Sequence, residues 1–100
     1  MEMILLADIL KDRAFPDSGN ILYDLLANAI SKKEKVCIDM KDVVTLPTLF
    51  LNPSLGKIIE NYGLDKLKEC MTFKNITKGH ADKIIKYIEK FISFSGQSKK

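Results

Sequence analysis

The sequence predicts an α/β fold with a small, mainly parallel sheet of three or four strands and helices packed on it. Short apolar runs that suit buried strands alternate along the chain with longer segments whose apolar residues recur with helical spacing. The resulting order is strand, helix, strand, helix, strand, helix. This alternation is typical of parallel sheets, because two parallel strands need a crossover connection, and that connection is usually a helix.

The first strand is expected within Met3–Leu10, which is apolar apart from Asp8. Lys11–Gly19 is rich in turn-forming residues, and Ser18 is placed to cap the helix that follows. That helix is predicted over Asn20–Lys33. Its apolar residues recur on one face of a 3.6-residue period: Ile21, Leu22, Leu25, Leu26, Ala29 and Ile30.

The middle of the chain predicts a buried strand and a second helix. Lys35–Met40 carries apolar residues on both faces, as a buried parallel strand does. Val43–Phe50 could extend this strand or bend away from it. Pro53 belongs in the first turn of the next helix or just before it, because proline lacks the donor that an interior helical residue needs. Gly63 is placed to end this helix, and Gly56 suggests that another backbone passes close by.

The last part of the chain predicts a third strand over Cys70–Phe73 and a final helix from Thr77 to Phe94. Before them, Leu64–Glu69 is expected to be a short connector or a single helical turn. The buried stripe of this helix is expected to contain Ala81, Ile84, Ile85, Ile88, Phe91 and Ile92.

Length and composition indicate one globular domain. The chain has 100 residues, 46% of them hydrophobic and 29% charged, which excludes a disordered or collagen-like chain. We expect a single domain over residues 1–94 and a flexible basic tail over residues 95–100. No apolar run is long enough to span a membrane, and the first ten residues lack the basic start of a signal peptide. Cys37 and Cys70 lie in apolar runs, so we expect free thiols and a cytoplasmic location.

Few residues suggest catalysis, and neither a cofactor nor a metal is expected. The chain has no glycine-rich phosphate-binding loop, and His80 is its only histidine. Asp39 and Asp42 follow a parallel strand, where two carboxylates could bind a divalent cation if further ligands were present. A small enzyme using this pair, or using Cys70 with His80 in reach, stays open as an alternative.

The charge distribution leaves a nucleic-acid-associated role open as another alternative. Residues 51–100 carry ten Lys and Arg against five Asp and Glu, whereas residues 1–50 carry six against eight. A basic half can attract nucleic acid or an acidic surface. Arg13 is the only arginine, however, and arginine is the favoured residue for reading bases and holding phosphates. A solvated lysine face is the simpler interpretation.

The middle segment resembles STAS-like domains, the domains of sulfate transporters and anti-sigma factor antagonists. A hydrophobic strand ending in Asp39 precedes a loop that opens a helix, as in this family. Phe50-Leu51-Asn52 and the following Gly56 match a STAS-like family of bacterial proteins, and the resemblance covers most of residues 19–92. Two positions depart from the family pattern. Asp42 stands where the family has glycine before Val43, and the family's paired hydroxyls fall at Thr48 and Leu49.

This resemblance implies a non-enzymatic regulatory module that binds a protein partner. In anti-sigma factor antagonists, a serine at this helix start is phosphorylated by a kinase-like partner, which is thereby released. The resemblance thus implies a partner with a histidine-kinase-like ATPase domain and a phosphorylation site at Thr48, with Ser54 second. The expected docking surface contains Thr48, Leu49, Phe50, Asn52, Ser54 and Lys57. The simpler interpretation of Thr48 is that its hydroxyl caps the helix.

The apolar run Leu49–Leu51 leaves one further alternative. An exposed apolar patch marks an interface. If these three residues were exposed, they would favour a self-associating protein, such as a homodimer.

Overall fold

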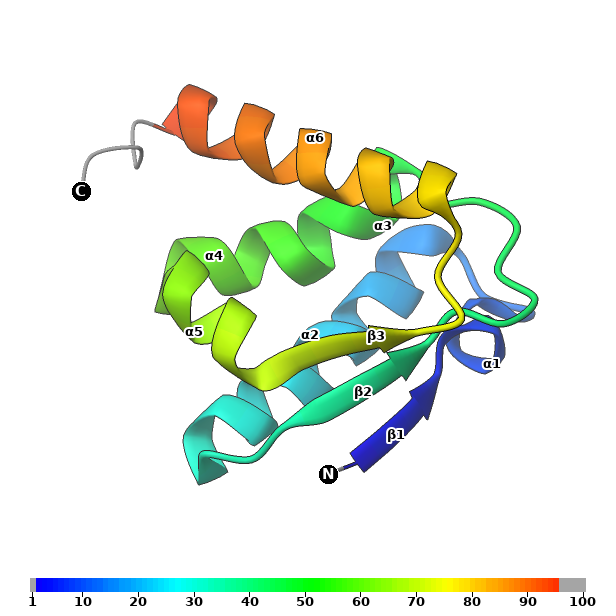
Figure 1. Ribbon diagram of the computed structural model, residues 1–100, viewed down its shortest axis with the longest axis horizontal. Helices are drawn as coiled ribbons and strands as arrows, with labels where there is room; N and C mark the ends of the chain where they lie inside the picture. Colours follow the sequence, from blue (N-terminus) through cyan, green and yellow to red (C-terminus); the bar gives the residue numbers. More distant parts are fainter. Residues whose placement is uncertain (1, 96–100) are drawn as a thin grey trace.

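The computed structural model describes residues 2–95 and shows a three-stranded, fully parallel sheet with packed helices (Figure 1). The strands are β1 (Glu2–Leu5), β2 (Val36–Asp39) and β3 (Met71–Lys74), in the order β1-β2-β3. Each strand has four residues, and β2 is buried throughout because it has a neighbour on each side. The predicted α/β fold class is therefore confirmed. The tail expected at residues 95–100 lies, apart from Ser95, outside the described residues.

The first predicted strand is only half correct. Helix α1 (Leu6–Leu10) follows β1 without a loop. Within it, Leu6 and Ile9 are buried at a spacing of three, which a helix places on one face and a strand does not. The apolar run Met3–Leu10 therefore supplies a strand and a helical turn to the same core.

Helix α2 (Phe15–Lys32) begins five residues before its predicted start. Pro16 lies in its first turn, where proline is well tolerated because that N–H has no partner within the helix. Ser18 is not the expected cap. It is fully buried inside the first turns, and its hydroxyl donates to the carbonyl of Phe15 at 2.9 Å. Lys33 ends the helix in the left-handed conformation.

The second half of the chain is mostly helical. Helix α3 (Thr48–Leu51), the π-helical turn η1 (Asn52–Gly56) and helix α4 (Lys57–Tyr62) follow one another without interruption. Gly63, with φ +96°, separates α4 from α5 (Leu64–Cys70), which extends the single helical turn allowed for the predicted connector. Cys70 therefore closes α5 and does not open the third strand. Helix α6 (Lys78–Ser95) comes last.

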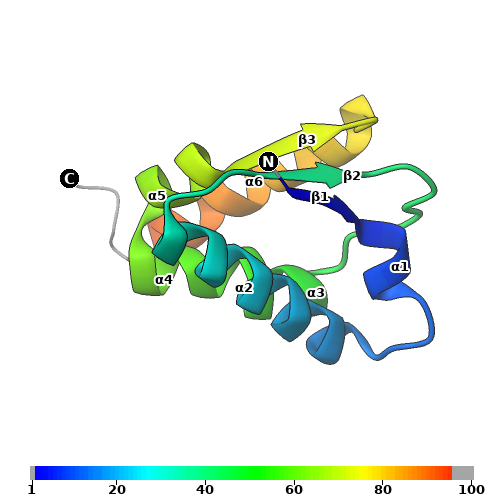
Figure 2. The same ribbon diagram turned by 90° about the horizontal axis from the view of Figure 1, so that it is seen from below.

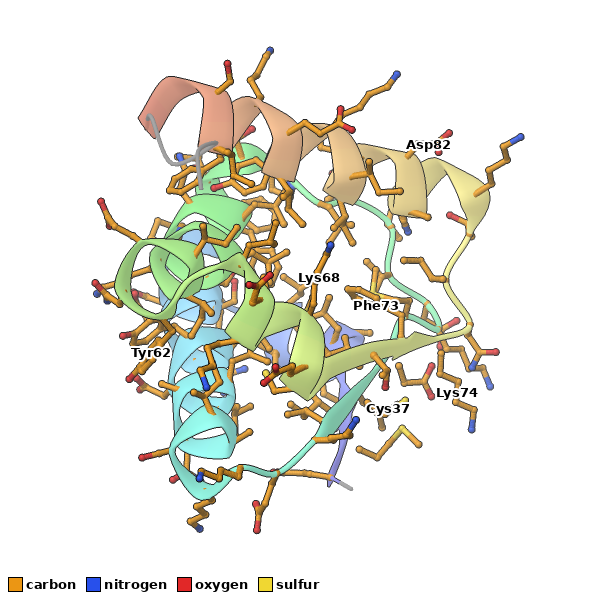
Figure 3. All side chains as sticks on the ribbon, turned by 60° about the vertical axis from the view of Figure 1, so that its left-hand side comes forward. Cys37, Tyr62, Lys68, Phe73, Lys74 and Asp82 are labelled. Carbon is orange, nitrogen blue, oxygen red and sulfur yellow. The ribbon has the colours of Figure 1, made fainter. Side chains whose placement is uncertain are left out.

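The helices pack against one face of the sheet, and the core lies between them. Figure 2 shows α2, α3 and α4 together on one side of the strands. Ile4 and Ile38 point into this core, whereas Met3 and Leu5 on the opposite face are about half exposed. Figure 3 shows the same alternation, with Phe73 on the helical side of β3 and Lys74 on the other. The molecule therefore has two layers and one uncovered sheet face.

None of the helices within residues 2–95 combines the length and apolar character that crossing a membrane requires.

Candidate partner-binding surface

The segment expected to bind a partner forms the continuous helical stretch α3–η1–α4. Pro53 lies inside this stretch and not at its first turn, so the predicted helix start is wrong by five residues. A proline inside a regular helix removes a hydrogen bond and clashes with the preceding turn. The chain accommodates it by widening into the π-helical turn, where the backbone N–H of Lys57 donates to the carbonyl of Asn52, five residues earlier.

Two residues of the expected docking surface belong to the core. Phe50 is among the largest fully buried side chains, and Ser54 is also fully buried. The Ser54 hydroxyl donates to the carbonyl of Phe50 at 2.7 Å, which gives that carbonyl a partner at the π-helical turn. Contrary to our prediction, neither side chain can contact a partner in this structure, and Ser54 is inaccessible to a kinase.

Thr48 is exposed and does not cap its helix. Pro47 occupies the capping position, Thr48 is the first helical residue, and no side chain hydrogen bond caps this helix start. The simpler interpretation of Thr48 as a cap is therefore wrong. Leu49 beside it is 63% exposed, and Val44 in the preceding loop is 88% exposed.

Asn52 and Lys57 are also exposed, but they contact different neighbours. The Oδ1 atom of Asn52 accepts a hydrogen bond from the hydroxyl of Tyr87 on α6, at 2.6 Å. The Lys57 ammonium lies 5.0 Å from the centre of the Tyr23 ring on α2, within reach of a cation–π interaction. The structure thus places Asn52 beside α6 and Lys57 beside α2, so the expected residues do not form one continuous patch.

Helix α2 packs against the α3–η1–α4 segment and comes very close to it at Gly19. A Cβ atom added to Gly19 would lie 2.5 Å from Cγ of Pro53 and 2.7 Å from the carbonyl oxygen of Phe50. Real Cβ atoms essentially never come this close to such atoms. The absence of a side chain at residue 19 therefore lets α2 approach the π-helical turn.

Helix α6 covers the opposite side of the segment. A Cβ atom on Gly56 would collide with the Tyr87 hydroxyl and lie 3.2 Å from Cε1 of Phe91. The close neighbours of Gly56 are thus two aromatic side chains, and not the backbone that we expected. Burial raises the pKa of Tyr87 to about 12, because a charged phenolate is poorly solvated there.

An open groove of about 780 Å³ lies along α6, and the candidate phosphorylation site is among its lining residues. Thr48 lines this groove together with residues of α6, among them Lys83, Lys86 and Lys90. Asp82 and Glu89 line it as well. Thr48 therefore lies beside a helix surface of mixed charge with one more lysine than carboxylate.

The ends of the strands form a second polar cluster. Asp39 accepts hydrogen bonds from the side chain of Asn75 and from the backbone N–H of Lys41, both at 3.0 Å. These two bonds and the nearby Lys74 and Lys41 charges lower the pKa of Asp39. Asp39 is therefore a satisfied structural carboxylate that ties β2 to the loop after β3.

The structure does not assemble the alternative catalytic or metal sites. Within residues 2–95, no group of three His, Cys, Asp or Glu side chains could hold a metal ion. Cys70 and His80 lie before and after β3, at opposite ends of that strand. His80 instead contacts the carbonyl oxygen of Val44 through Nε2, at 3.3 Å. Cys37 and Cys70 are buried free thiols, and burial raises the pKa of Cys70, which disfavours a reactive thiolate.

Sequence reasoning missed two residues of this surface. Val44 is 88% exposed and lies in the loop before α3, and Tyr87 covers Asn52 from α6. The sequence leaves open whether Val43–Phe50 bends away from the strand. In the structure the chain turns at Asp42, which has φ +66°, so Val44 lies outside the strand. Tyr87 stands one residue before Ile88 in the predicted stripe, and only the packing of α6 shows that it points inward.

Comparison with known families gives one match. A family model described as a STAS-like domain of unknown function (DUF4325) matches residues 18–81. The matched region runs from the start of α2 through β2, the α3–η1–α4 segment, α5 and β3, and stops at Ala81 in the first turn of α6. No curated protein and no solved structure shows a significant match to the chain.

Proposed function

Since the chain belongs to the family of STAS-like domains of unknown function, we propose that it is a non-catalytic regulatory module that binds a protein partner. The docking surface consists of Val44, Thr48 and Leu49, extended by Asn52. The observation that carries this proposal is the exposure of Val44 and Leu49, at 88% and 63%. Two large apolar side chains exposed within six residues, beside an exposed hydroxyl, provide the apolar centre and polar contact that a protein interface uses.

The partner that fits is a protein with a histidine-kinase-like ATPase domain, as the likeness of this segment to anti-sigma factor antagonists suggests. In this proposal the partner also acts as the kinase for Thr48. The Thr48 oxygen forms a bond to the γ-phosphorus of a nucleoside triphosphate, and the bond from that phosphorus to the β,γ-bridging oxygen breaks. The nucleoside diphosphate leaves, and a base of the kinase takes the hydroxyl proton.

Phosphorylation at Thr48 would then weaken docking. A phosphoryl group adds close to two negative charges next to the apolar side chain of Leu49. Burying such a group against an apolar partner surface costs free energy, unless the partner supplies paired cations. Thr48 therefore acts as a switch for partner release.

The experiment is an affinity capture from the native host with purified bait variants. Leu49→Asp and Thr48→Glu alter the docking surface, and Lys35→Glu serves as a matched control, since Lys35 is an exposed residue just before β2. We expect wild type and Lys35→Glu to retain a kinase-like ATPase that both docking-surface variants lose. Urea unfolding of each bait confirms that the variants are folded.

The captured ATPase is then incubated with bait and ATP. Wild-type bait should gain about 80 Da, the mass of one phosphoryl group, and Thr48→Val should not. Equal capture by Leu49→Asp and wild type, or a mass gain that persists in Thr48→Val, would show that the proposal is wrong.

A further inference from the structure

Helix α6 runs in the same direction as the α3–η1–α4 segment (Figure 1). The contacts between them join residues that are 35 or 36 positions apart. His80 contacts Val44 across 36 residues, and Tyr87 contacts Asn52 across 35. Phe91 lies against Gly56, which is again 35 residues earlier. Three contacts along the helix therefore share one register.

This register places Thr48 opposite Lys83. Thr48 lies between Val44 and Asn52, and the same offset of 35 residues from Thr48 leads to Lys83. An offset of 36 would lead to Ile84, which is buried in the core, whereas Lys83 is exposed. Thr48 and Lys83 both line the groove along α6, which agrees with this placement.

The basic residues of α6 continue on the same side of the helix. Lys86 and Lys90 follow Lys83 at spacings of three and four, which are neighbouring positions on a helix surface, and both line the groove. Asp82 and Glu89 reduce the charge of this surface but leave an excess of one positive charge. A dianion attached to Thr48 would meet Lys83 and Lys86 within one turn of α6.

We propose that Lys83 and Lys86 bind the phosphoryl group carried by Thr48 and so fasten α6 to the α3–η1–α4 segment. This inference rests on the proposed function, which supplies the phosphorylation, and adds the device by which the chain responds to it. Tyr87 of α6 donates a hydrogen bond to the Oδ1 atom of Asn52. When α6 is held in place by the phosphoryl group, this acceptor is less available to a partner.

The packing of α6 makes it responsive to such a contact. Of its described side chains, Ile84 alone is fully buried, and Ile85 is 54% exposed. A helix held by few buried contacts opens more readily than the core. Two added ion pairs therefore change its opening measurably, although each surface pair is individually weak.

The test uses protein in which phosphothreonine is incorporated at residue 48 during synthesis, so that no kinase is needed. Hydrogen exchange of the α6 amides is compared between phosphorylated and unmodified protein. We expect exchange over residues 84–92 to slow about fivefold on phosphorylation. The slowing should disappear in Lys83→Gln/Lys86→Gln and persist in the matched control Lys33→Gln/Lys35→Gln, whose lysines line a groove formed by α2 and α5 residues.

Two further measurements show whether ion pairs with the lysines, and not an unrelated stabilisation of the protein, cause the slower exchange. The slowing should shrink at 1 M salt, where the Debye length is about 3 Å. In ³¹P NMR, the second pKa of the phosphothreonine should fall below its ordinary value of about 6 in wild type, and return to it in the double lysine variant.

Unchanged or faster exchange in α6 on phosphorylation would overturn the inference, because Asp82 and Glu89 would then outweigh the lysines. The same holds if the slowing survives removal of both lysines. Failure of the proposed function is read separately, as absence of ATPase capture or of phosphoryl transfer to Thr48, and does not alter the exchange result.

Discussion

Replacement of Gly19 by alanine tests the close approach that supports the docking segment. The added Cβ atom would lie 2.7 Å from the carbonyl oxygen of Phe50, whereas ordinary contacts begin at 3.4 Å. The contact with Cγ of Pro53 is shorter still, at 2.5 Å, so helix α2 and the α3–η1–α4 segment must separate by about 0.7–0.9 Å. The Phe50 carbonyl is backbone and cannot rotate away, and Pro53, the other close neighbour, has a rigid ring.

Two effects of opposite sign determine the size of the change. Forcing an extra carbon into a well-packed interface costs about 1–3 kcal/mol. Alanine is favoured over glycine inside a helix by about 1 kcal/mol, which offsets part of this cost. Because the added atom meets a backbone oxygen and a rigid proline ring, the steric cost falls in the upper half of its range. The free energy of unfolding should therefore fall by about 1–2 kcal/mol. For a domain of this size, the Tm should fall by roughly 5–15 °C.

Urea unfolding followed by circular dichroism measures the change, and Gly79→Ala provides the matched control. Gly79 also lies in a helix, but the nearest atom to its added Cβ would be Oγ1 of Thr77 at 4.0 Å. Without a steric cost, Gly79→Ala should leave stability unchanged or raise it by up to about 1 kcal/mol. If Gly19→Ala proved as stable as wild type, the packing argument for α2 would be refuted.

Three further outcomes follow from the structure. Gly56→Ala should displace the Tyr87 hydroxyl, remove its hydrogen bond and lower the free energy of unfolding by about 1 kcal/mol, with faster amide exchange in α6; unchanged α6 exchange would contradict this. Burial raises the pKa of Tyr87 to about 12, so its neutral form stabilises the fold fully below pH 10, and this contribution is lost between pH 10 and 12. Between pH 10 and 12 the urea midpoint of Tyr87→Phe should therefore fall less steeply than that of wild type. Identical pH profiles of the two proteins would contradict the burial of Tyr87 as the cause. The hydrogen bond from Asn75 lowers the pKa of Asp39 from 3.8, so this stabilisation is present above pH 3.8 and lost as the pH falls through the folded-state pKa. Asn75→Gly keeps the left-handed backbone accessible and should lower the urea midpoint relative to wild type at pH 6. The difference between the two urea midpoints should disappear at a pH below the folded-state pKa of Asp39.

The sheet and helix α2 could be predicted because their residues carry local signals. Val36–Asp39 has apolar residues on both faces, and the structure buries all four residues of the central strand. On α2, Leu22, Leu26 and Ala29 repeat with helical spacing and are buried in the protein core. In each case the burial pattern repeats regularly, so the period reveals the element.

The docking segment was predicted less accurately because its shape depends on contacts between distant residues. Pro53 could be placed inside a helix only by knowing that the π-helical turn, the Ser54 hydroxyl and Gly19 accommodate it together. The inward stripe of α6 was misplaced at Ile85, since this helix meets its neighbours through Ile84 and Tyr87. Sequence periodicity identifies the apolar face of a helix, but it does not show how much of that face is covered by the rest of the protein.

The late position of α6 has a consequence during protein synthesis. Apart from Ile84, every buried apolar side chain among the described residues lies at or before Cys70. The core can therefore close on the ribosome before the last helix emerges. At 5–20 residues per second, the 18 residues of α6 take about 1–4 s to make. Until α6 has emerged and packed, Asn52 lacks the Tyr87 hydroxyl, so a partner present at the ribosome would meet the docking surface before α6 can compete for it.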